Sequence, residues 1–178
     1  ATRTARRPPP QPGVDGYTHR VTAFTIPSST GELAATQFEP AGDARHTLVL
    51  AHGAGAGQGH PWMRARAGDL ATRGLRVITF DFPYITARRK VPDRAPVLLT
   101  AWRAVVAHVT TTWADAPVAI GGKSMGGRMA TMLMGEPDAP AAVSACLALG
   151  YPLHPPGKPD QLRVAHLGAI RVPLLVIQ

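Results

Sequence analysis

Short apolar runs alternate with longer amphipathic segments along most of the chain. The first two runs, residues 17–26 and 33–38, are rich in β-branched and aromatic side chains, with Ser-Ser-Thr-Gly-Glu between them. This short, glycine-containing connection predicts an antiparallel hairpin. Later runs are almost wholly apolar, which is typical of parallel strands that are buried on both faces. These later predicted strands are residues 47–51, 75–80, 118–121, 142–149 and 173–177.

Segments with a helical spacing of apolar residues lie between these strands. The clearest covers residues 96–113, where apolar side chains such as Trp102 and Val109 recur on one face. Further helices are predicted at residues 62–72, 126–135 and 162–167. Strand and helix therefore alternate after the hairpin, and this order predicts an α/β protein with a mostly parallel, doubly wound sheet.

Length and composition limit the domain organisation. The 178 residues are enough for one domain with a substantial core. Residues 1–13 are basic and proline-rich, so we predict a disordered tail there and a folded domain over residues 14–178. The single cysteine, Cys146, excludes a disulfide framework, and its apolar surroundings predict a buried, unreactive thiol. No apolar stretch approaches the ~18 residues of a membrane span, so we expect a cytoplasmic protein without a membrane partner.

The net charge of +8 comes mostly from arginine and is spread along the chain. Dense basic clusters occur only in the first seven residues and at Arg88-Arg89-Lys90. Because no aromatic-rich basic motif accompanies them, we expect a solvated surface and no nucleic-acid partner. The Arg88-Arg89-Lys90 cluster and Lys123 leave an acidic substrate open as an alternative.

Two glycine-rich segments suggest nucleotide binding but lack the necessary spacing. Gly122-Lys123-Ser124 matches the end of a phosphate-binding loop, yet Pro117 stands where its first glycine is required. The run Gly53-Ala54-Gly55-Ala56-Gly57-Gln58-Gly59 fails the dinucleotide pattern, because Gln58 or His60 occupies the last glycine position. We therefore expect no cofactor, and no metal site.

The segment Gly122-Lys123-Ser124-Met125-Gly126 also satisfies the pattern of a nucleophile elbow. In such a turn the serine is exposed between a strand and a helix, and flanking glycines avoid collisions with neighbouring backbone. An elbow serine needs two backbone N–H groups that face the developing oxyanion. We predict Met125 as one donor and Ala54 as the other, with Gly55 as the alternative to Ala54. A glycine-rich loop without chemistry remains the simpler interpretation.

Four motifs occur in an order that resembles one enzyme family. They are AHGAGAG, DFPY followed by RRKVPDRAPVLL, GGKSMGGRMA and YPLHPPGKP. From about residue 46 to 178 the chain resembles the α/β-hydrolase family that includes testis-expressed protein 30 and NSL-complex subunit 3, which is related to dienelactone-hydrolase-like enzymes. The resemblance implies an α/β-hydrolase fold, Ser124 as nucleophile, and Ala54 and Met125 in the oxyanion hole. The implied activity is cleavage of an ester or related acyl bond in a small-molecule substrate.

The acid and histidine of the catalytic triad are not recognisable in the chain. In the family that it resembles they follow the strand that matches residues 173–178, so we expect both after Gln178, together with the last strand and helix of the fold. By this expectation, the chain up to Gln178 is an incomplete domain with weak or no activity. Within the chain His154 is the alternative base, but no acid lies at a suitable strand end before it.

A second class of function remains open. Relatives of this kind include a subunit of a chromatin complex, so a non-catalytic interaction or scaffold protein could retain the same fold. The oligomeric state has no signal in the sequence.

Overall fold

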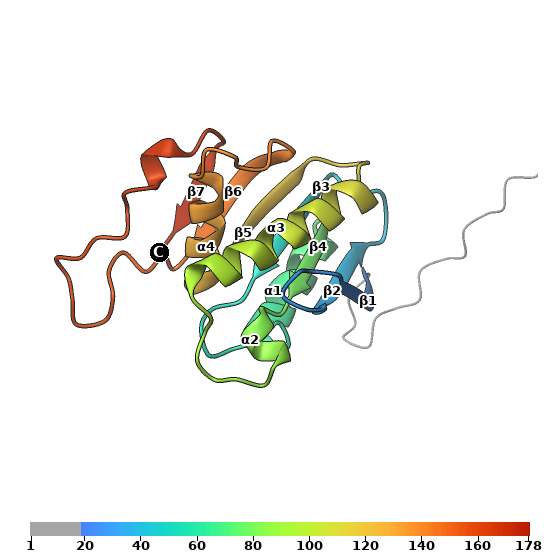
Figure 1. Cartoon of the computed structure of the whole chain (residues 1–178). Helices are drawn as coiled ribbons and strands as arrows, with labels where there is room; N and C mark the ends of the chain where they lie inside the picture. The colour runs from blue at the N-terminus through green and yellow to red at the C-terminus, as the bar shows by residue number, and fades with distance from the viewer. Residues whose placement is uncertain (1–18) are drawn as a thin grey trace, which may run out of the picture.

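A mixed sheet of seven strands runs through the structure, a computed structural model that describes residues 19–178 (Figure 1). The predicted tail at residues 1–13 lies outside the described residues. The strands are β1 (His19–Ile26), β2 (Leu33–Pro40), β3 (His46–Ala51), β4 (Leu75–Phe80), β5 (Val118–Lys123), β6 (Val143–Leu149) and β7 (Leu174–Ile177). Their order across the sheet is β1-β2-β4-β3-β5-β6-β7. The five strands from β4 to β7 in this order are mutually parallel.

The N-terminal hairpin is confirmed. Strands β1 and β2 pair antiparallel from His19 opposite Pro40 to Ile26 opposite Leu33, and β2 continues antiparallel onto β4. A mostly parallel sheet with an antiparallel hairpin at one edge is therefore present, as the apolar pattern predicts.

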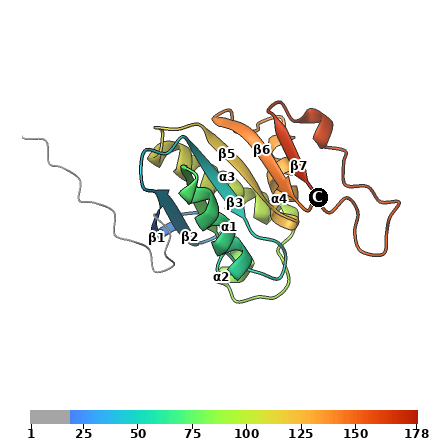
Figure 2. The same cartoon turned by 180° about the vertical axis from the view of Figure 1, so that it is seen from behind.

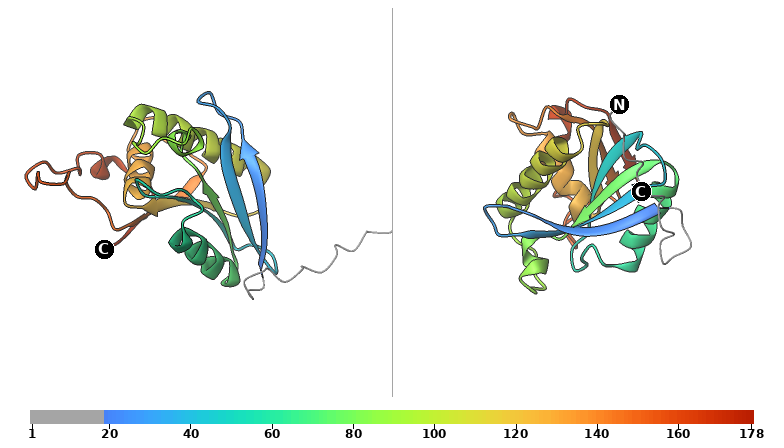
Figure 3. Two further views of the ribbon diagram at one scale, coloured as in Figure 1. Left: turned by 90° about the horizontal axis from the view of Figure 1, so that it is seen from below. Right: turned by 90° about the vertical axis from the view of Figure 1, so that its right-hand side faces the viewer.

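Helices cover both faces of the sheet. On one face lies α1 (Pro61–Thr72), and on the other lie α3 (Ala95–Thr112) and α4 (Met125–Met134) (Figures 1 and 2). The views in Figure 3 show the sheet between these two helical layers. Alternate residues of one strand serve the two faces, as strand geometry requires: Val49 packs on the α3 and α4 side, and Leu50 on the α1 side.

One predicted helix was wrong, and one short helix was not predicted. The predicted helix at residues 162–167 is absent. Residues 162–166 belong to an irregular loop, and a 3₁₀ turn follows at Leu167–Ala169. The backbone of this loop is engaged elsewhere, since the Arg163 N–H donates to the Leu153 carbonyl at 2.8 Å. The single-turn helix α2 (Pro83–Thr86) was not predicted, because four residues are too few to establish a period.

Cys146 agrees with its prediction. The thiol is buried in the sheet, and burial raises its pKa to about 12. A thiol protonated at neutral pH is a weak nucleophile, so the residue acts as a small apolar core side chain.

Candidate active site

The turn that carries Ser124 joins β5 to α4. Ser124 has φ 49° and ψ −112°, and Arg88 is the other non-glycine residue between 19 and 178 with positive φ. The Ser124 N–H donates to the Leu149 carbonyl at 2.8 Å, and the Ser124 carbonyl accepts from the Arg128 N–H at 3.0 Å. The first bond attaches the turn to the end of β6, and the second starts the helix. Together they hold Ser124 in a conformation that L-residues rarely adopt.

The glycines on either side of Ser124 are required by a close approach of β3. A Cβ on Gly122 would lie 2.5 Å from the Ala51 carbonyl oxygen, and one on Gly126 would lie 2.6 Å from the same oxygen. Real Cβ atoms are essentially never found this close to another atom. The spacing of glycine, serine and glycine therefore has the steric cause that the elbow pattern predicts.

The loop after β3 lies against this turn. A Cβ added on Gly53 would stand 3.6 Å from the Ser124 Cβ and 3.4 Å from the Lys123 carbonyl oxygen, so the loop passes within about one side-chain atom of the turn. Ala54, Ser124 and Met125 line one pocket. The structure thus brings the three predicted site residues together, whereas the alternative donor Gly55 is not in the lining and forms a turn with φ 75°.

His52 holds the base of the same loop. The side chain is fully buried, its Nδ1 lies 2.8 Å from the Gly53 carbonyl oxygen, and its Nε2 accepts from the Phe82 N–H at 3.2 Å. These two bonds require a neutral ring with the proton on Nδ1. Burial lowers the pKa of His52, although Gly53 and Asp81 partly offset this effect. Because both ring nitrogens bond to backbone, His52 positions the loop and is not free to accept a proton from a substrate.

Gln58 fastens the far side of this loop, a role that the sequence did not reveal. Its N–H donates to Asp81 Oδ1 at 2.7 Å, and its side-chain amide donates to the Ala34 carbonyl at 2.9 Å and accepts from the Thr79 hydroxyl at 2.9 Å. The glycine-rich loop is therefore attached to β2 and β4 as well as to the elbow. The only signal in the sequence was that glutamine stands where a dinucleotide loop needs glycine.

Lys123, the residue before Ser124, contacts α1. Its Nζ lies 4.7 Å from the centre of the Trp62 ring, within the range of a cation–π interaction. Lys123 is not among the residues that line the pocket. Its position is explained by contact with Trp62 at the start of α1.

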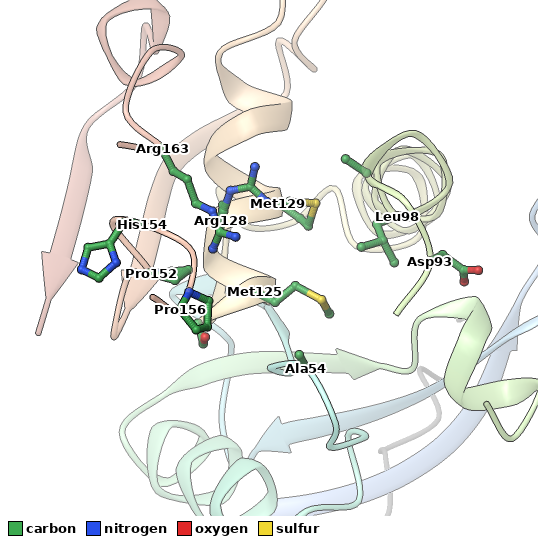
Figure 4. A pocket seen from close by; sticks show the side chains of 12 residues that line it. Ala54, Asp93, Leu98, Met125, Arg128, Met129, Pro152, His154, Pro156 and Arg163 are labelled. Atoms are coloured by element: carbon green, nitrogen blue, oxygen red, sulfur yellow. The ribbon is translucent and has the colours of Figure 1, made fainter. Parts of the chain in front are cut away.

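The pocket above Ser124 has a volume of about 390 Å³ and is open to solvent (Figure 4). Its walls come from the loop after β3, the start of α3, the elbow with α4, and the long loop after β6. The lining residues beyond the three predicted site residues are Asp93, Ala95, Leu98, Arg128, Met129, Pro152, His154, Pro156 and Arg163. Such a pocket at the carboxyl ends of parallel strands is where α/β proteins bind ligands.

The histidines near the pocket do not complete a triad within residues 19–178. His154 is exposed on the rim, and its Nδ1 lies 3.0 Å from the Pro155 carbonyl oxygen. His166 contacts α4, where its Nε2 lies 3.0 Å from the Thr131 hydroxyl oxygen. Burial lowers the pKa of His166. Neither imidazole forms an ion pair with a carboxylate of the described part of the chain.

Between residues 19 and 178, no group of three or more His, Cys, Asp and Glu side chains is arranged to hold a metal ion. In the same range, no helix is both long and apolar enough to cross a membrane.

Comparison with known proteins identifies the family. Residues 44–178 match the family described as alpha/beta hydrolase domain, which is most of the chain, so the chain belongs to that family. No curated protein matches the chain.

Solved structures agree with this assignment. A dienelactone hydrolase from Anabaena variabilis is similar, with a TM-score of 0.71 and 21% identity over 90% of this chain and 73% of that chain. An alpha-beta serine hydrolase homologue from Coxiella burnetii has a TM-score of 0.69 and 17% identity over 87% of this chain and 72% of its own. A serine hydrolase without a lid from Xanthomonas campestris has a TM-score of 0.69 and 19% identity, over 89% of this chain and 70% of that chain. At these identities the likeness shows the fold.

Proposed function

We propose that this protein is a serine hydrolase that cleaves an ester or related acyl bond of a small-molecule substrate, with Ser124 as nucleophile. The observation that carries the proposal is the geometry of the elbow. Ser124 is held at φ 49° between β5 and α4, and it shares one pocket with Ala54 and Met125. The esterase and hydrolase names of the structural neighbours are consistent with this chemistry.

In the proposed reaction the Ser124 hydroxyl oxygen attacks the carbonyl carbon of the ester, and its proton passes to a histidine base. The carbonyl oxygen becomes an oxyanion, which accepts hydrogen bonds from the backbone N–H groups of Ala54 and Met125. Collapse of this intermediate expels the alcohol, which takes up the proton, and leaves an acyl-serine. Water then attacks the acyl group, releases the carboxylic acid and restores the serine hydroxyl.

The triad acid and histidine are proposed to lie in residues that follow Gln178. Strand β7 ends beside the site: the Gly150 N–H donates to the Ile177 carbonyl at 2.7 Å, and the Gln178 side chain donates to the Tyr151 carbonyl at 3.3 Å. Since parallel strands end at one edge of the sheet, any residue after Gln178 would start at the edge that carries Ser124. Of the wider family, we propose kinship with testis-expressed protein 30 and NSL-complex subunit 3, on the four motifs, and a cytoplasmic location.

A fluorophosphonate probe tests the nucleophile in the full-length protein. We expect labelling of the unmodified protein, loss of labelling in Ser124→Ala, and a fall of kcat/KM by about 10⁴-fold or more with a p-nitrophenyl ester. Ser29→Ala is the matched control, because Ser29 is exposed in the hairpin turn, far along the chain from the pocket lining. Labelling that persists in Ser124→Ala would overturn the assignment.

The alternative is a scaffold that retains the fold without catalysis. Full-length protein that is folded by circular dichroism, yet neither labels nor hydrolyses any ester, would favour it. The strained φ of Ser124 is the observation against this alternative, because such strain is typical of functional sites.

A further inference from the structure

Arg128 lies beside the proposed nucleophile, and its guanidinium forms no ion pair with any carboxylate of residues 19–178. It lies in the first turn of α4, its N–H donates to the Ser124 carbonyl at 3.0 Å, and both residues line the pocket. Its Nε is buried and has no hydrogen-bond partner among residues 19–178. Leaving a buried donor without a partner is unfavourable, and more so when the group is charged.

Arg163 adds a second positive charge at the same end of the pocket. It belongs to the loop after β6, and its side chain reaches toward Arg128 (Figure 4). Burial, and next the charge of Arg163, lower the pKa of Arg128, but a guanidinium remains charged at neutral pH. Two cations therefore face the same space, and neither forms an ion pair with a carboxylate of residues 19–178.

Two other partly or fully buried arginines each form ion pairs with two carboxylates. Arg76 binds Glu39 and Asp115 at 2.8 Å each, and Arg103 binds Glu136 and Asp138. The pocket arginines differ from these, although Asp93 lines the same cavity. Asp93 lies across the pocket and accepts from Arg89 at 2.6 Å (Figure 4).

The backbone that carries Arg163 is fixed. The Tyr151 hydroxyl, on a buried side chain, donates to the Arg163 carbonyl at 2.7 Å, and the Arg163 N–H donates to the Leu153 carbonyl at 2.8 Å. Arg128 is fixed by its place in α4. Two guanidinium groups on fixed backbone are suited to bind one oxyanion, since each can donate two parallel N–H bonds to a carboxylate or phosphate.

We propose that Arg128 and Arg163 form an anion subsite of the catalytic pocket, so that the substrate carries a carboxylate or phosphate close to its scissile acyl bond. This inference rests on the proposed hydrolase function. In the arrangement, the anionic group lies between the two arginines and the acyl carbon lies at Ser124. The apolar side chains of Leu98, Met125 and Met129 line the part of the pocket that would hold the substrate carbon atoms between the acyl group and the anionic group.

The test compares two esters of nearly equal size on the full-length protein: p-nitrophenyl butyrate and the mono-p-nitrophenyl ester of succinic acid. We expect kcat/KM for the anionic ester to exceed that for the neutral ester at least tenfold. In Arg128→Met and in Arg163→Met this ratio falls at least tenfold, and in Arg128→Lys it is partly retained. Arg64→Met is the matched control, because the Arg64 side chain is exposed on α1, and it leaves the ratio unchanged.

A binding measurement separates this proposal from the proposed function. Succinate and inorganic phosphate are titrated against Ser124→Ala and against Ser124→Ala/Arg128→Met by calorimetry. The first protein is expected to bind at least one of the two anions tenfold more tightly than the second, and the better anion tells whether the subsite prefers carboxylate or phosphate. Anion binding without any ester hydrolysis would retain the subsite and reject the hydrolase.

Two results would overturn the subsite. One is an ester ratio near one in the unmodified protein, with no change in the arginine variants. The other is equal anion affinity with and without Arg128. Either result would mean that another part of the protein neutralises Arg128.

Discussion

The backbone N–H of Phe82 donates to Nε2 of His52 at 3.2 Å, and this bond joins the loop after β4 to the loop after β3. The other nitrogen of this fully buried imidazole, Nδ1, lies 2.8 Å from the Gly53 carbonyl oxygen. Gly53 in turn passes close to Ser124, since a Cβ added on Gly53 would stand 3.6 Å from the Ser124 Cβ. Ala54, the proposed oxyanion donor, is thus held by a side chain that does not itself enter the pocket.

Replacement of His52 is expected to disturb this loop. In His52→Phe the Phe82 N–H loses its acceptor, so we expect the free energy of unfolding to fall by about 1–3 kcal/mol. Since the change moves the oxyanion donor, kcat should fall more than KM rises. Urea denaturation and steady-state kinetics measure the two effects. Unchanged kcat would show that Ala54 is positioned without His52.

His52 also makes stability depend on pH. Its pKa is lowered in the folded protein from an ordinary value of 6.5, so the unfolded chain binds the proton more readily. The contribution of His52 is therefore complete above pH 6.5 and is lost as the pH falls below it. We expect the stability difference between unmodified protein and His52→Phe to shrink between pH 7.5 and pH 5.5. A constant difference across this range would contradict the neutral buried state.

Relief of strain at the elbow should be measurable. Residue 124 has φ 49°, which glycine adopts without penalty, so Ser124→Gly should be more stable than Ser124→Ala by about 1 kcal/mol. At exposed Ser29 the same pair of substitutions should show glycine equal to or less stable than alanine. Chemical denaturation of the four variants decides the matter. Equal stability of the two variants at position 124 would mean that the turn relaxes.

The close approach of β3 predicts an intolerant position. In Gly122→Ala the new Cβ would stand 2.5 Å from the Ala51 carbonyl oxygen, and backbone cannot move away cheaply. We expect a loss of at least about 3 kcal/mol, and with it loss of fluorophosphonate labelling. Gly42→Ala is the control, since no atom lies within 4 Å of its added Cβ and the change should be nearly neutral.

The ion pair between β2 and β4 should dominate the acid side of the stability profile. Arg76 donates from Nε and Nη2 to the Glu39 carboxylate at 2.8 and 3.0 Å. Burial alone would raise the pKa of Glu39, but the bonds from Arg76 and Gln37 outweigh it and lower the pKa.

Stability from Glu39 is therefore complete above pH 4.5 and is lost as the pH falls below it. Arg76→Met leaves the buried Glu39 carboxylate without its main donor, so we expect a loss of about 3–5 kcal/mol. In the double variant Arg76→Met/Glu39→Gln much of this loss should be recovered. Denaturation at pH 7 gives both values, and equal losses in the single and double variants would refute the argument.

The apolar pattern was sufficient for the sheet because each strand must bury its side chains on one or both faces. The predicted strand at residues 75–80 has the same bounds as β4, the first strand agrees over its described residues, 19–26, and the others differ by one or two residues at an end. The helix predicted at residues 162–167 failed because its periodicity is short and tertiary bonds hold the segment as a loop.

The glycine and serine spacing predicted the tight turn at Ser124, since the close approach of β3 leaves few other residues possible at Gly122 and Gly126. Sequence reasoning could not find Gln58 or the Arg128 and Arg163 pair in the same way. Their roles depend on which residues the fold brings near them, and on whether a carboxylate is among those neighbours. Arg76 and Arg128 look alike in the sequence, yet one is paired in the described residues and the other is not.

The contact between Lys123 and Trp62 gives the elbow an optical reporter. The ammonium group lies 4.7 Å from the ring centre, one residue before Ser124, and indole emission shifts in wavelength when a nearby charge moves. Trp102 and Trp113 lie elsewhere, so the difference between unmodified protein and Trp62→Phe isolates this signal. Acylation of Ser124 could then be followed by fluorescence in stopped flow, without any attached dye.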